Sequence, residues 1–164
     1  MAKLGDFEID LNFSINESFQ CSYKITDSFF SIKENSLYTK ADINVDLNCT
    51  RREANLELLF EIKGFVLVEC ERCLKPIRMD VTSSFLDVKT FTSDTDLLKL
   101  ENYVSEDQNK LSVYDSIYEQ ICIAMPQRLI CDNAMGSNKC DFNLETEQEP
   151  TIDPRWNELK KLID

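Results

Sequence analysis

Residues 56–81 have the sequence LELLFEIKGFVLVECERCLKPIRMDV, and their pattern indicates the architecture of the chain. Apolar and polar residues alternate on both sides of its centre, which is the period of a strand that buries one face. Between the two alternating parts lies the turn Cys70-Glu71-Arg72-Cys73-Leu74-Lys75-Pro76. The pattern therefore predicts two antiparallel strands joined by this turn. We expect Gly64 to interrupt the first strand as a bulge.

The same alternation recurs in the first part of the chain, in segments 7–15, 19–25 and 37–49. From Ser112 the period becomes helical, because Val113, Ile117 and Ile121 share one face, and Pro126 ends the helix. We therefore expect an α+β fold. Its antiparallel, β-rich body is either a sheet or a partly closed barrel, with one packed helix near 112–125 and a short C-terminal helix.

The chain divides by composition into two parts. Residues 1–126 are expected to form a β-rich domain with the packed helix, in which the polar segment 92–110 is a solvated loop. Residues 127–164 are expected to be an irregular, cysteine-containing segment followed by a tail. The tail ends in a short helix that starts with an N-cap aspartate and a first-turn proline. We expect this helix start to bind a partner through Asp153, Pro154, Arg155 and Trp156.

Composition limits the function. The chain has 164 residues, a formal charge of −12 and no histidine. The missing imidazole removes the commonest general base and the Ser-His and Cys-His nucleophile pairs, so we expect no enzyme activity. The negative charge argues against a general nucleic-acid-binding surface. Residues 1–6 lack the apolar core of a secretory signal, and no apolar run reaches the roughly 20 residues that span a bilayer. We expect a cytoplasmic protein without membrane contact.

The chain has seven cysteines, of which Cys70 and Cys73 lie in the predicted turn. They are metal ligands, reduced structural thiols or a redox pair. A closed zinc site needs four ligands, and Cys131 and Cys140 are the candidates for the second pair. Their eight-residue separation is wider than the usual two to four. The other three cysteines, at positions 21, 49 and 122, fall in apolar-periodic positions and are expected to be small core residues.

Basic residues gather around the cysteine turn, although the chain as a whole is acidic. Arg72, Lys75 and Arg78 lie within or just after it. One interpretation is that these charges only keep a turn solvated. The other is a local patch that binds RNA phosphates. Both interpretations stay open at this stage.

Several short motifs, taken in order, resemble the YceD family of large ribosomal RNA subunit accumulation proteins. The resemblance covers residues 56–164 and rests on Cys70-x-x-Cys73-Leu74-x-Pro76, Ala124-Met125-Pro126, Cys131, Asn143-Leu144 and Asp153-Pro154-Arg155-Trp156. The chain departs from many bacterial members, which have a denser late cysteine cluster with a Cys-x-x-Cys-Gly element. Here Cys131 and Cys140 remain and Asp141 replaces the glycine, so Asp132 or Asp141 is a further candidate ligand.

The resemblance implies a non-enzymatic role in 23S ribosomal RNA accumulation and large-subunit assembly. The implied partners are pre-ribosomal 23S rRNA or a basic large-subunit ribosomal protein. Two other hypotheses compete with it. One is a cysteine-based zinc or redox protein. The other is an acidic protein–protein adaptor that binds no RNA.

Overall fold

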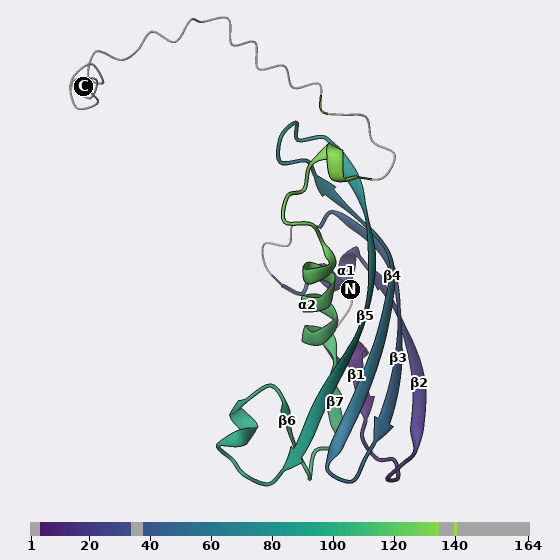
Figure 1. Cartoon of the computed structure of the whole chain (residues 1–164), viewed down its shortest axis with the longest axis vertical. Coiled ribbons are helices and arrows are strands. Elements are labelled where there is room, and N and C mark those ends of the chain that lie inside the picture. The colour runs from purple at the N-terminus through teal and green to yellow at the C-terminus, as the bar shows by residue number, and fades with distance from the viewer. Residues whose placement is uncertain (1–3, 34–37, 135–139, 141–164) are drawn as a thin grey trace, which may run out of the picture.

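The computed structural model describes residues 4–33, 38–134 and 140, and its main feature is a long, curved sheet (Figure 1). The sheet has five strands in the order β2-β3-β4-β5-β6. Consecutive strands from β2 to β5 pair antiparallel, and β6 joins the end of β5 in parallel. The strands are β2 (Ser18–Thr26), β3 (Lys40–Arg51), β4 (Asn55–Glu69), β5 (Pro76–Thr92) and β6 (Tyr103–Ser105).

Short elements complete the described part of the chain. A second, two-stranded sheet pairs β1 (Glu8–Asp10) with β7 (Lys110–Ser112). The helical elements are η1 (Leu4–Phe7), α1 (Asp27–Phe30), η2 (Leu97–Lys99), α2 (Tyr114–Ala124) and η3 (Cys131–Asn133). Helix α2 lies along the concave face of the sheet beside β5 (Figure 1).

The core lies between the concave face and α2, and alternation along the strands produces it. Even-numbered residues of β4 from Leu56 to Val68 point inward and are buried, except for Gly64. Helix α2 contributes Ile117 and Ile121, both fully buried. Burying one face of each strand removes a continuous apolar surface from water, at about 25 cal/mol per Å² of apolar area. The opposite face of the sheet stays exposed and carries most of the polar residues.

Aromatic packing fixes the start of α2. The Tyr114 hydroxyl donates a hydrogen bond to the backbone carbonyl of Phe29, at 3.2 Å, in the buried interior. The Phe29 ring also packs edge-on against Phe7, with ring centroids 4.9 Å apart. Such pairs add about 0.5–1.5 kcal/mol beyond area burial. Together they join η1, α1 and α2 over one end of the core.

The structure confirms the α+β class with an antiparallel β-rich body and one main helix. Within residues 4–33 and 38–134 the sheets are open, so these residues form no barrel. The bulge prediction at Gly64 is wrong, because pairing runs unbroken from Lys63 through Gly64 to Phe65 on both sides. The segment 92–110 is not only loop, since it contains η2 and β6. The predicted C-terminal helix lies outside the described residues, and the division of the chain at residue 126 stays a prediction.

Candidate metal centre

The turn between β4 and β5 holds the first two thiols. The Cys70 N–H donates to the Lys75 carbonyl at 2.9 Å, and the Leu74 N–H donates to the Cys70 carbonyl at 2.8 Å. Leu74 has φ 58°, a left-handed conformation that costs an L-residue about 1–2 kcal/mol. The tight turn brings Cys70 and Cys73 to the same side of the hairpin tip.

The segment that follows α2 brings the other two thiols to this tip. The Glu71 N–H donates to the Leu129 carbonyl at 2.8 Å, which ties the turn to this segment. Two residues further along, Cys131 begins η3 and is buried. Cys140, which is half-buried, completes the group. The four cysteines thus come from two parts of the chain that are separated by about 60 residues in sequence.

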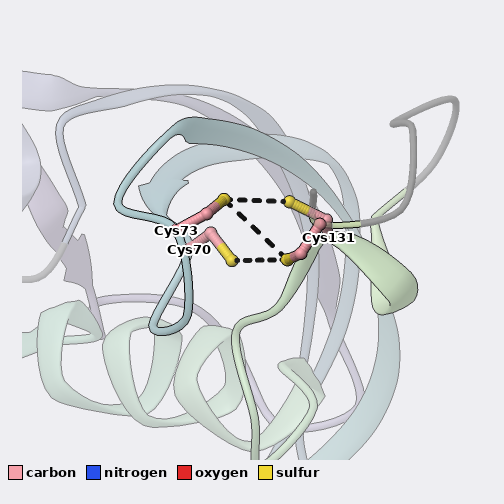
Figure 2. A group of neighbouring side chains, drawn as sticks. Cys70, Cys73 and Cys131 are labelled. Carbon is pink, nitrogen blue, oxygen red and sulfur yellow. Dashed lines mark hydrogen bonds between the residues drawn. The ribbon is translucent and has the colours of Figure 1, made fainter. Parts of the chain in front are cut away.

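The sulfur atoms form a compact group, and all four lie within 4.8 Å of one another. Cys70 and Cys140 are 3.6 Å apart, Cys73 and Cys131 are 3.5 Å apart, and Cys73 and Cys140 are 3.8 Å apart. Figure 2 shows Cys70 and Cys73 on the hairpin facing Cys131 across a short gap. A tetrahedral zinc ion with Zn–S bonds of about 2.3 Å requires sulfurs about 3.8 Å apart. The observed separations therefore fit a tetrahedral metal.

The electrostatic environment differs from thiol to thiol. Burial acts to raise the pKa of the Cys70 thiol, but three backbone N–H groups and the Cys140 thiol outweigh it and lower the pKa to about 6. Those N–H groups belong to Cys73, Arg72 and Cys131. The pKa of Cys131 is raised, first by the neighbouring Cys140 thiol and then by burial. Burial likewise raises the pKa of Cys140. A metal must displace the protons that these thiols retain.

The donor set determines what the cluster can do. Four sulfur ligands fill a tetrahedral coordination shell and leave no open position for water or substrate, which is the pattern of a structural site. Soft thiolate sets in this geometry select zinc or iron. Cys70 is fully buried and Cys131 is 5% exposed, whereas Cys73 and Cys140 are half-buried, so the centre is partly shielded from solvent. The cluster can hold a metal, and a bound metal would join the β4–β5 turn to the segment that follows α2.

The basic residues of the turn are largely engaged with acidic or aromatic neighbours. Arg72 pairs with Asp132 at 3.3 Å, so this carboxylate faces the turn arginine. Arg78 pairs with its strand neighbour Asp80 at 3.0 Å and stacks on a phenylalanine ring 3.8 Å away. Lys75 is exposed at the tip. The three cations lie near one end of the sheet, and their binding to RNA stays a prediction.

The remaining predicted residues fall in different places. Cys49 is buried in the core as expected, and Cys21 is half-buried. Cys122 is exposed on α2, so its prediction as a core residue is wrong. Its position is one residue past the buried Ile121, outside the apolar stripe of the helix. The proposed partner-binding residues 153–156 and the alternative ligand Asp141 lie outside the described residues.

Sequence reasoning did not identify the contacts that bring the two halves of the cluster together. The backbone bond from Glu71 to Leu129 and the pair between Arg72 and Asp132 carry no sequence signature. Among the described helices, none is both long and apolar enough to cross a membrane.

Comparison with known proteins identifies the family. The family model described as large ribosomal RNA subunit accumulation protein YceD matches residues 58–163, which include all four clustered cysteines. No curated protein and no solved structure gives a significant match. The match covers well over half of the chain. The chain therefore belongs to the YceD family of large ribosomal RNA subunit accumulation proteins.

Proposed function

We propose that this protein is a non-enzymatic assembly factor of the cytoplasm that supports 23S rRNA accumulation. The observation that carries this proposal is the four-cysteine cluster at the hairpin tip, in a chain whose family is linked to large-subunit rRNA. In the proposal the cluster holds zinc through Cys70, Cys73, Cys131 and Cys140. The metal supplies a structural cross-link and no chemistry on a substrate.

The cross-link gives the tip a fixed shape. It holds the β4–β5 turn against the segment that starts η3, and this sets the position of Arg72 and Lys75 relative to that segment. A rigid tip binds with a smaller loss of side-chain and loop entropy than a mobile one does. The tip is accordingly the surface that we propose for pre-ribosomal RNA.

The charge distribution supports the tip rather than the exposed face of the sheet as an RNA contact. On the exposed face Asp42 pairs with Lys24 and Glu61 pairs with Lys63, whereas Asp46 has no ion pair among the described residues and repels phosphate. Arg72, Lys75 and Arg78 gather near the tip instead. The acidic face favours a second candidate function, the binding of a basic large-subunit ribosomal protein.

Metal content tests the structural part of the proposal. Protein purified without chelator is expected to contain one zinc ion per chain by elemental analysis, and Cys70→Ser with Cys131→Ser is expected to contain none. Cys122→Ser is the matched control, because this thiol is exposed and lies outside the cluster. Purified wild-type protein without zinc or iron would exclude the metal cross-link.

Gradient sedimentation and RNA binding test the functional part. Depletion is expected to lower 23S rRNA, and the protein is expected to co-sediment with large-subunit precursors. Replacing Arg72, Lys75 and Arg78 by alanine is expected to make the slope of log K for RNA binding against log salt concentration shallower by about two to three. A matched triple replaces Lys24, Lys63 and Lys110, which pair with acidic residues elsewhere. Equal slopes for the two triples would refute RNA binding at the tip.

Nuclease treatment separates the RNA candidate from the protein candidate. If RNA is the partner, precursor material is released from the immobilised protein by nuclease. If a basic ribosomal protein is the partner, it remains bound after nuclease and is eluted by salt. Unchanged 23S rRNA in depleted cells would remove both candidates.

A further inference from the structure

Strand β5 leaves most of one edge open. It pairs with β4 along its length, but on its other side only Thr90–Thr92 pair, with β6. Among the residues that the structure describes, no strand covers the edge of residues 76–89. An edge of this length presents a row of backbone donors and acceptors that another chain can pair with. The open edge is therefore a candidate docking feature.

The hydrogen-bond pattern shows which residues of β5 face this edge. The Phe91 N–H donates to Ala54, on the β4 side, at 2.9 Å, whereas the Thr90 N–H donates to Asn102, on the β6 side, at 2.8 Å. In an antiparallel pair both backbone groups of one residue point to the same side, and the side alternates along the strand. Even-numbered residues of β5, such as Leu86, therefore direct their N–H and C=O groups toward the open edge.

A groove of about 830 Å³ runs beside this edge. Phe85 and Leu86 of β5 line one side, and Glu119 and Gln120 of α2 line the other. The segment 98–104, which includes the first two residues of β6, also lines the groove. In Figure 1 this region is bounded by β5, α2 and the loop that carries β6. The residues of β5 that line the groove lie between positions 85 and 89, directly before the stretch Thr90–Thr92 that pairs with β6.

The α2 wall of the groove is held at a fixed distance from the strand. The Ser116 hydroxyl donates to the Asp87 carboxylate at 3.1 Å, which ties α2 to the inner face of β5. Asp87 also pairs with Lys89 at 3.0 Å, with both side chains largely covered. The groove is therefore preformed, which lowers the entropy cost of filling it.

Apolar side chains are exposed along the same stretch. Leu86 is 58% exposed, Val88 is 40% exposed, and Leu100 on the facing loop is 55% exposed. Outward-pointing residues of β5 from Thr82 to Thr90 carry no charge. Natural edge strands are usually protected by charged side chains, proline or bulges. On β5 the exposed charges, Arg78 and Asp80, lie nearer the cysteine turn, and the charges beside the groove, Asp87 and Lys89, point inward and pair with each other. The outward face of the edge beside the groove is therefore uncharged and partly apolar, as suits a strand that receives a partner.

Charge indicates the chemistry of that partner. The lysines that line the groove are paired, Lys33 with Asp115, Lys89 with Asp87 and Lys99 with Asp96. Glu101 and Glu119 form no ion pair among the described residues, whereas the partner of Lys99, Asp96, lies outside the lining. The lining therefore holds three lysines and four carboxylates, an excess of one negative charge.

We propose that this groove binds an extended, basic segment of a partner protein, which adds to β5 as a further strand. Main-chain hydrogen bonds to the open edge supply affinity, and side chains at alternate positions supply specificity. Residues of the segment that face α2 meet Glu119 and are basic, whereas the alternate residues lie beside Leu86 and Val88 and are apolar. This inference depends on neither the cysteine cluster nor RNA; it rests on the second candidate function, a basic protein partner, and assigns such a partner a binding site.

A synthetic ten-residue peptide of alternating lysine and valine, labelled with fluorescein, is the probe, and fluorescence polarisation with the full chain measures its binding. Leu86→Pro removes an N–H that faces the open edge without removing a ladder bond to β4. This variant is expected to bind the peptide at least tenfold more weakly. Gln20→Pro is the matched control on β2, the other edge strand of the sheet. The Arg51 N–H donates to the Glu17 carbonyl, so odd-numbered residues of β2 face β3 and the N–H of Gln20 points away from the sheet.

Two further measurements separate main-chain pairing from charge attraction. The same peptide with N-methyl groups at alternate residues keeps its charge but lacks half of its donors, and it is expected to bind at least tenfold more weakly. Hydrogen exchange of the wild-type chain is expected to slow at least tenfold at Ser84, Leu86 and Val88 when the peptide is added. Hydrogen exchange needs no variant, so it tests strand addition to β5 even if Leu86→Pro fails to fold.

Several results would overturn the inference. They are absence of peptide binding at millimolar concentration, equal affinity of Leu86→Pro and wild type, equal affinity of the N-methylated peptide, and unchanged exchange at the three amides. A concentration-dependent dimer of the free protein that Leu86→Pro abolishes would show that a second copy of the chain occupies this edge instead.

Discussion

Gly64 provides a sharp test of how closely β3 and β4 approach each other. A Cβ atom added at this position would lie 2.2 Å from the Asp42 carbonyl oxygen and 2.5 Å from the Ile43 Cα. Carbon–oxygen contacts in proteins are normally about 3.3 Å or longer. Because both blocking atoms belong to the backbone, no change of rotamer relieves the overlap. In Gly64→Ala, β3 must therefore move away from β4 by roughly 1 Å.

The cost of this movement follows from what surrounds the glycine. The two ladder bonds nearest the Gly64–Ile43 pair weaken, and each contributes about 1 kcal/mol. Ile43 and Ile62 are fully buried, and looser packing around them costs about 1–2 kcal/mol more. Alanine regains about 0.5–1 kcal/mol through its smaller loss of chain entropy. The free energy of unfolding is expected to fall by about 2–3 kcal/mol.

Thermal denaturation followed by circular dichroism measures this difference. For a chain of this size each kcal/mol lowers Tm by about 2–4 °C, so Gly64→Ala is expected to melt about 4–12 °C below wild type. Gly5→Ala is the matched control, because nothing lies within 4 Å of a Cβ at that position. If the two variants melt within about 2 °C of each other, the close approach of the strands is wrong.

Other predictions concern the cluster and the core. Chelator is expected to lower the Tm of wild type and to leave the Tm of Cys131→Ser unchanged, and Cys122→Ser, measured alongside, is expected to respond like wild type. Tyr114→Phe leaves a buried backbone carbonyl without its donor and is expected to cost about 1–3 kcal/mol in urea denaturation. Burial raises the pKa of Tyr114 above its ordinary value of 10.0, so the neutral hydroxyl stabilises the fold fully below pH 10. This stabilisation is lost as the pH rises further. Tyr114→Phe is therefore expected to lose less stability than wild type in alkaline melts.

The main strands and α2 were predictable because their patterns are local. Alternation along β4 and the stripe of Val113, Ile117 and Ile121 on α2 each depend only on neighbouring residues. β6 and η2 were missed, because three-residue elements are set by their surroundings and carry no period. The role of Gly64 was also mistaken, since a backbone approach from β3 is a tertiary contact that leaves no mark in the sequence around the glycine.

The candidate site was predictable in its members but not in its assembly. Cys70 and Cys73 have the short spacing of a ligand pair, and their turn was predicted. Cys131 and Cys140 have no such spacing, and only the path of the chain after α2 carries them to the tip. The exposure of Cys122 was missed because the helical period identifies the buried residues of α2 but not which of their direct neighbours are exposed.

The 70 positions that separate Cys70 from Cys140 have a consequence for the order of events during synthesis. The second thiol pair begins 58 positions after the first pair ends, so the ribosome makes the hairpin first. In the proposed arrangement a metal ion gains its full ligand set only after residue 140 has left the exit tunnel. In the proposed arrangement the availability of zinc at that moment controls when a newly made chain becomes competent to act.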